Sequence, residues 1–137
     1  MAAIKESGLG WTTLSVDDSA GSVQAIKNDI TNLDVATPRG VQDVTGIDKS
    51  AIERLLLLAD FSIGLNGVFD DQAGQAHAVF KTVPSTSVAR TTTIVVSGNT
   101  LAPEVLYTDY HLTRAASGEL TWEAPGVLAD GTVPTWS

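Results

Sequence analysis

The stretch YTDYHLTRAASGELTW, residues 107–122, has the pattern of a strand, a tight turn and a second strand. Ser117 and Gly118 mark the turn, because serine and glycine favour turn positions. Side chains alternate between the two faces of a strand. This places a polar set on one face and an apolar set on the other: Tyr107, Asp109, His111 and Thr113 against Leu106, Tyr110 and Leu112. The sequence therefore predicts a β-hairpin with one face turned to the core.

The polar residues of this hairpin do not form a recognisable catalytic site. Asp109 and His111 share a strand face and could form a charged pair, but a solvated sheet face is the favoured interpretation. A serine hydrolase would show a nucleophile elbow of the form G-x-S-x-G, which is missing. The histidines, His77 and His111, lack the H-E-x-x-H spacing of a zinc site. We expect no enzyme activity, no catalytic residue, no bound metal and no cofactor.

Other acidic and glycine-rich positions have simpler interpretations. The pairs Asp17-Asp18 and Asp70-Asp71 could bind a hard cation, but neither lies in an EF-hand pattern, so solvated turn acids are favoured. No glycine cluster is followed by the G-K-[ST] of a phosphate-binding loop.

Composition restricts the class of protein. A chain of 137 residues, 43% hydrophobic and 18% charged, suits one globular domain, 1–137. The net charge is −8 and the basic residues are scattered, whereas a nucleic-acid-binding domain carries a basic patch. This argues against a DNA-binding domain but does not exclude a protein that handles DNA without holding it. The chain has no cysteine, no apolar run of about 18 residues and no signal-peptide pattern, so we expect synthesis in the cytoplasm.

The remaining sequence is rich in strand patterns. Strands are predicted near residues 11–16, 23–30, 59–69, 89–97, 105–115 and 119–124. A short helix is predicted at about 73–82 and ends at Pro84. Residues 50–57 are ambiguous, because Ser50 and Glu53 form a capping-box pattern while the leucines that follow could equally extend a buried strand. The pattern favours a mainly β fold, a β-sandwich or partly open barrel with a flanking α-helix.

Particular residues are expected to form the core and the contact surface. The predicted core consists of Phe61, Ile63, Leu65, Phe80, Leu112 and Trp122. Residues 1–10 are predicted to be a flexible arm and residues 32–48 a long loop. Loops of that length in compact domains are usually functional. We therefore expect the loop to contact a partner, with an assembly role for Pro38, Arg39, Val41 and Asp43.

The C-terminal third resembles a known family. LAPEVLYTDYHLTRAASGELTWEAPGVLADGTVPTW, residues 101–136, resembles the end of the major tail protein, or tail tube protein, of tailed bacteriophages. Two further stretches also resemble that family, DVTGIDKSAIERLLLLADFSIGLNGVFDD at 43–71 and AHAVFKTV at 76–83. The resemblance covers about residues 10–136 and consists of strands, turns and a helix rather than a catalytic motif.

The resemblance implies a structural virion protein. In that family a β-sandwich with a helix at its side forms hexameric rings, and the sheets of neighbours join into a ring-shaped β-barrel. The rings stack into a tube whose channel conducts DNA during ejection, and the loop predicted at residues 32–48 is expected to lie between rings. The implied partners are other copies of the chain, the tape-measure protein and duplex DNA in the channel, and the tail tip and tail terminator proteins. The implied location is a virion tail, long and non-contractile, assembled in the host bacterial cytoplasm.

Two points follow for this chain. An acidic lumen would let DNA slide, and Asp109 is a candidate lumen-facing residue. The alternative to a tube subunit is a small non-catalytic β-sandwich module that binds a protein or a carbohydrate.

Overall fold

The structure is a computed structural model that describes residue 5 and residues 7–137. Half of the predicted flexible arm, residues 1–4 and 6, lies outside the described residues. The last part of that arm is ordered as a 3-10 helix, η1 (Gly8–Gly10), and the Ser7 side chain accepts a hydrogen bond from the Leu9 N–H.

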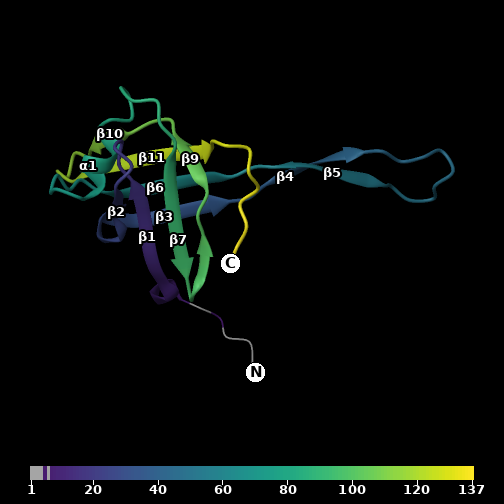
Figure 1. Ribbon diagram of the computed structural model, residues 1–137, viewed down its shortest axis with the longest axis horizontal. Helices are drawn as coiled ribbons and strands as arrows, with labels where there is room; N and C mark the ends of the chain where they lie inside the picture. Colours follow the sequence, from purple (N-terminus) through teal and green to yellow (C-terminus); the bar gives the residue numbers. More distant parts are fainter. Residues whose placement is uncertain (1–4, 6) are drawn as a thin grey trace.

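Nine strands of the described chain form one antiparallel sheet in the order β2-β1-β7-β9-β11-β6-β3, with β8 paired to β7 and β10 paired to β11 (Figure 1). The strands are β1 (Trp11–Asp17), β2 (Val23–Ala25), β3 (Ile30–Ala36), β6 (Ser62–Val68), β7 (Arg90–Val96), β8 (Asn99–Leu101), β9 (Glu104–Tyr107), β10 (His111–Arg114) and β11 (Leu120–Leu128).

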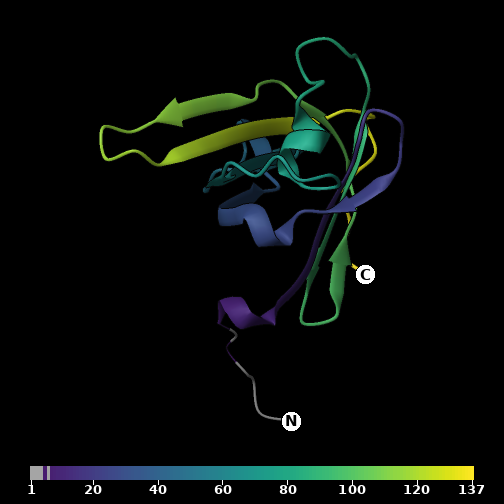
Figure 2. The same cartoon turned by 90° about the vertical axis from the view of Figure 1, so that its left-hand side faces the viewer.

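The sheet folds over itself, as the sequence predicted for a sandwich or open barrel. β9 joins the two halves, since its Val105 pairs with Arg90 of β7 and its Tyr107 pairs with Gly126 of β11. β1 and β7 run across the direction of β3, β6 and β11 (Figures 1 and 2). β2 and β3 end the sheet, so the described part of the chain forms no closed barrel.

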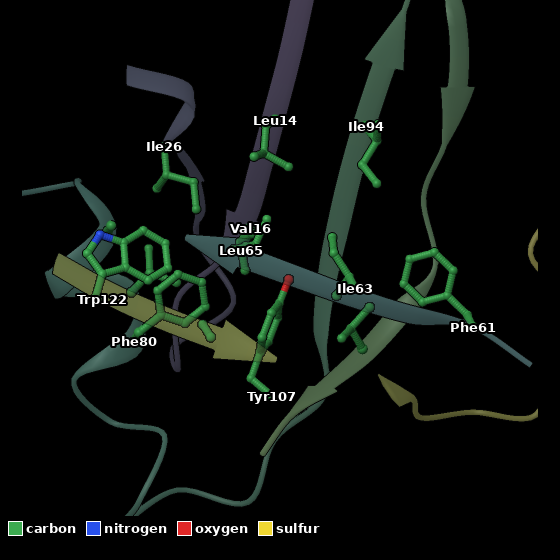
Figure 3. Packing of buried hydrophobic residues seen from close by; sticks show 14 of the residues in the cluster. Leu14, Val16, Ile26, Phe61, Ile63, Leu65, Phe80, Ile94, Tyr107 and Trp122 are labelled. Carbon is green, nitrogen blue, oxygen red and sulfur yellow. The ribbon is translucent and has the colours of Figure 1, made fainter. Parts of the chain in front are cut away.

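The core lies between the two halves of the sheet (Figure 3). Strand alternation places it there: in β6, Ile63 and Leu65 are buried, while Ser62, Gly64 and Asn66 are half-buried on the other face. Five predicted core residues are at most 3% exposed: Phe61, Ile63, Leu65, Phe80 and Trp122.

Leu112 is the predicted core residue for which the prediction is wrong, because its side chain is 44% exposed. It pairs with Trp122 and therefore shares the inner face of the sheet. However, β10 is an edge strand, and the β10–β11 hairpin extends beyond the body of the molecule (Figure 2). Phe80 packs against Trp122, with ring centroids 5.3 Å apart, but in the described part of the chain no strand lies beyond β10, which carries Leu112.

The single strand predicted at 105–115 is two strands, which changes the predicted faces. Residues 108–110 separate β9 from β10, so the alternation does not continue through them. Tyr107, predicted on the polar face, is buried, and its hydroxyl lies 2.7 Å from Thr92 Oγ1. Leu106, predicted to pack inward, is 41% exposed.

The predicted helix at 73–82 is present but shorter, as α1 (Ala76–Phe80). It packs at the end of the sheet that carries β10 (Figure 1). Its first N–H, on Ala76, donates to the Asp29 carboxylate at 2.9 Å, which anchors the helix to η2 (Lys27–Asp29). The predicted strand at 23–30 is replaced by β2, η2 and the first residue of β3.

Two further expectations are corrected by a second sheet. The loop predicted at 32–48 is instead most of β3 followed by β4 (Arg39–Asp43), and the helix alternative at 50–57 is wrong because β5 (Arg54–Ala59) is a strand. β4 and β5 pair antiparallel, with Val41 opposite Leu56. Pairing of β5 with β4 outweighs the local helix signal of the capping box.

Candidate assembly surface

The β4–β5 hairpin is the candidate functional surface. It projects far from the body of the molecule, as Figure 1 shows, in continuation of β3 and β6. Every residue of β4 is exposed, and in β5 only Ala59 is partly covered. The side chain of Arg39 donates through Nε to the Leu57 carbonyl at 2.8 Å, and the Asp60 N–H donates to the Pro38 carbonyl at 3.0 Å, which fixes the base of the hairpin.

The hairpin is apolar on both faces. Leu56 lies opposite Val41, and strand alternation places Leu55 and Leu57 on the other face. A methyl group added to Gly40 would lie 3.3 Å from the Leu57 side chain, so these two residues are in contact on that second face. The exposed fractions are large for leucine: Leu55 55%, Leu56 54%, Leu57 44% and Leu58 92%. Exposed apolar patches of this kind mark protein interaction sites, and here two faces require cover.

Hydrogen bonds order the tip of the hairpin. The Thr45 hydroxyl donates to the Asp43 carboxylate at 2.6 Å, and the Glu53 N–H donates to the same hydroxyl at 2.9 Å. The hydrogen bonds from Thr45 hold the pKa of Asp43 below its usual range. Beyond them, Ile47 is fully exposed at the end of the hairpin.

The structure brings the predicted assembly residues together on this hairpin. Pro38, Arg39, Val41 and Asp43 lie at its base and along β4. The leucines of β5 were missed as contact residues, because a run of four leucines is typical of a buried element. The run itself was a usable signal, because apolar residues at successive positions of a strand lie on both of its faces, and both faces then need to be covered.

A second surface is the outer face of β10, β11, β6 and β3. Its residues are polar or small, with no lysine or arginine among the strand positions described: His111 and Thr113; Thr121, Glu123, Pro125 and Val127; Ser62, Gly64, Asn66 and Val68; Asn32, Asp34 and Ala36. β3 and β10 leave free edges on opposite sides of this face. Asp109, the candidate lumen residue, is exposed in the connection before β10 and accepts a hydrogen bond from the Tyr110 N–H at 2.8 Å.

The two histidines lie in different parts of the structure. His77 Nδ1 lies 3.0 Å from the Tyr110 hydroxyl, within an aromatic cluster that includes Phe69. His111 pairs with Glu123 on the outer sheet face. Among the residues described, no group of three His, Cys, Asp or Glu side chains is placed to hold a metal ion. No helix in this part of the chain is long and apolar enough to cross a membrane.

The fold matches chains of solved tail particles. One is in the tail of an empty gene transfer agent (GTA) particle determined by helical refinement with C6 symmetry, with a TM-score of 0.75, 16% identity, and coverage of 97% of this chain and 98% of that chain. Another is in the virion of a native gene transfer agent particle, with a TM-score of 0.74, 15% identity, and coverage of 97% and 99%. No protein-family model and no curated protein matches the sequence.

The likeness establishes the fold over nearly the whole chain. It agrees with the mainly β class predicted from the sequence. A fold shared at this level of identity does not by itself define a role, so the surface of this chain carries the functional argument.

Proposed function

We propose that this chain is the major subunit of a phage-type tail tube. One observation carries the proposal: a chain with the fold of a tail solved with C6 symmetry also leaves a projecting hairpin whose apolar faces have no cover in the monomer. Self-assembly would supply that cover, because the hairpin lies beyond the reach of its own body.

Hexameric rings would use the free strand edges. An exposed edge strand presents unpaired N–H and C=O groups that another strand can satisfy. β10 and β3 are the outer strands of the same half-sheet, so β3 of one copy beside β10 of the next would continue one sheet around a ring. The product is the ring-shaped β-barrel that the resemblance implies.

The channel of such a barrel would be lined by the outer face of β10, β11, β6 and β3. That face contains Asp34 and Glu123 and no basic residue other than His111. Like charges repel, so duplex DNA would pass along an acidic wall without being held. Asp109 adds a further exposed carboxylate at the end of β10, and a tape-measure protein would occupy the same channel before ejection.

Stacking of rings would use the β4–β5 hairpin. It takes the inter-ring role expected of residues 32–48, now with the leucines of β5 as its principal contacts. Tail tip and tail terminator proteins would cover the ends of the stack. The long non-contractile tail and assembly in the host cytoplasm complete the proposal.

Negative-stain microscopy of the purified chain tests the proposal. Rings or tubes are expected, and replacing residues 44–53 by Asn-Gly should impair the stacking of rings into tubes without preventing ring formation. Asp43 and Arg54 pair directly, so a two-residue turn can close the shortened hairpin without disturbing the body. A chain that stays monomeric at every concentration would instead favour the small binding module.

A further inference from the structure

A groove at the open side of the sandwich is the second exposed apolar surface of the described residues. It has a volume of about 480 Å³ and lies between the start of β1 and the start of β3. Its apolar lining is Leu9, Trp11, Leu14, Ile30 and Leu33. Leu9 is 92% exposed at this groove, so an apolar side chain there is left in water by the monomer.

One polar feature defines what the groove would accept. Lys27 is the charged residue in the lining, and its exposed side chain donates through Nζ to the Thr12 carbonyl at 3.2 Å. The groove therefore suits an apolar side chain carried by a segment with a negative charge.

The tip of the β4–β5 hairpin has these properties. Ile47 is fully exposed at the tip, and the Asp48 side chain beside it is 78% exposed. Residues 43–53 contain three acids and one lysine. In a chain of net charge −8, copies repel one another, so contact is most favourable where a lysine of one copy meets the acidic tip of another.

The groove and the tip lie at opposite ends of the molecule. The groove is lined by the first residues of β3, at Ile30 and Leu33, whereas the hairpin leaves the body where β3 ends at Ala36 (Figure 1). A contact between unlike surfaces at opposite ends is head-to-tail, and repeated without closure it builds an open filament. This is the geometry that stacking of identical layers needs.

We propose that the hairpin tip of one copy docks in the Trp11 groove of another copy, with Ile47 in the apolar lining and Asp48 beside Lys27. This rests on the proposed function, since it specifies which surfaces meet between successive layers.

Disulfide cross-linking tests the contact, because the chain contains no cysteine of its own. Copies carrying Ile47→Cys are mixed with copies carrying Leu9→Cys, allowed to assemble and oxidised mildly. A covalent dimer is expected from this mixture. The matched control mixes Ile47→Cys with Val23→Cys, which is 69% exposed on β2 and outside the groove, and should give at least tenfold less dimer.

Microscopy of the same samples separates the outcomes. If tubes form but the Ile47→Cys and Leu9→Cys copies give no covalent dimer, the docking proposal is wrong and the proposed tube is unaffected. The same conclusion follows if the Val23→Cys control gives as much dimer. The dimer without tubes would support the docking and count against the tube. If deletion of residues 2–6 is what makes the dimer appear, the N-terminal segment of the same chain occupies the groove, and the proposal fails for the full chain.

A charge exchange gives a second readout that does not depend on cysteines. Lys27→Glu should raise the concentration needed for assembly by roughly two- to fivefold, the range of an exposed ion pair. Adding Asp48→Lys should restore assembly in that background. Failure of the second change to restore it would contradict the pairing of these two residues.

Discussion

Gly67 packs so closely against Asp29 that a methyl group on Gly67 would lie 1.8 Å from the Asp29 carbonyl oxygen. The same methyl group would lie 2.9 Å from the indole nitrogen of Trp122, which donates to the Val68 carbonyl at 3.1 Å. Gly67 pairs with Ile30 where the register of β3 and β6 shifts. A glycine here lets η2 and the start of β3 pack directly on the core.

Gly67→Ala should destabilise the fold strongly. The nearest atom belongs to the backbone and cannot rotate away, so the sheet itself must shift. We expect a loss of about 1–3 kcal/mol or more in unfolding free energy. The matched control is Gly64→Ala on the same strand, where the nearest atom to the new methyl group is 4.0 Å away. Urea denaturation below the assembly concentration measures both, and equal losses would contradict the packing described.

Phe80→Ala should cost roughly 3–5 kcal/mol of unfolding free energy. The side chain is fully buried, and its ring lies 5.0 Å from Tyr107 and 5.3 Å from Trp122, centroid to centroid. Phe69→Ala, which removes a half-buried ring, should cost clearly less. A loss below about 1 kcal/mol for Phe80→Ala would mean that α1 does not cover the sheet.

Asp29→Asn should stabilise the protein at neutral pH. Burial raises the pKa of the Asp29 carboxyl above its ordinary value of 3.8, and the nearby Asp70 carboxylate raises it further. The native state then binds a proton more tightly than the unfolded chain, so stability falls as pH rises from near 3.8 through the raised pKa. Asparagine keeps an oxygen acceptor for the Ala76 N–H without the buried charge.

Thermal unfolding across that pH range tests this expectation. The melting temperature of Asp29→Asn should fall less with rising pH than that of the parent protein. The melting temperature of Asp109→Asn, changed at an exposed position, should fall as much as that of the parent. A variant less stable than the parent at neutral pH would show that the charged form of Asp29 is the one that the fold requires.

Leu58→Lys should leave folding intact and impair assembly. The side chain is 92% exposed, so the unfolding free energy should change by no more than about 0.5 kcal/mol. In a stacked assembly the same position would bury an uncompensated charge on the hairpin. Sedimentation compares it with Val23→Lys, at 69% exposure on β2; equal loss of polymer in both would show that net charge, not the hairpin, is responsible.

Local sequence patterns predicted which residues are buried in the central strands, but not which are buried in the edge strand β10 or at the end of β9. Alternation in β6 identified Ile63 and Leu65 correctly, since each lies between two paired strands. Leu112 also lies on the inner face, opposite Trp122, but its burial depends on what covers an edge strand, which no local pattern encodes. Tyr107 was misplaced because the break at residues 108–110 interrupts the alternation.

The sequence located the candidate surface correctly but assigned it the wrong secondary structure. Residues 32–48 were expected to contact a partner, and part of that segment is β4 of the projecting hairpin. Its partner strand contains the leucine run, and their pairing joins segments separated by the whole tip of the hairpin. The groove at Trp11 was not predicted, since it combines residues from η1, β1 and β3 that only the fold brings together.

A cryo-electron microscopy reconstruction of the assembled chain at side-chain resolution is the decisive test of a tube built from this chain. We expect stacked six-membered rings, matching the C6 symmetry of the solved gene transfer agent tail. We also expect β3 beside β10 of the neighbour, a lumen carrying Asp34 and Glu123, and the β4–β5 hairpin covered between layers. Absence of ordered assemblies, or a lumen lined mainly by lysine and arginine, would contradict the proposed tube.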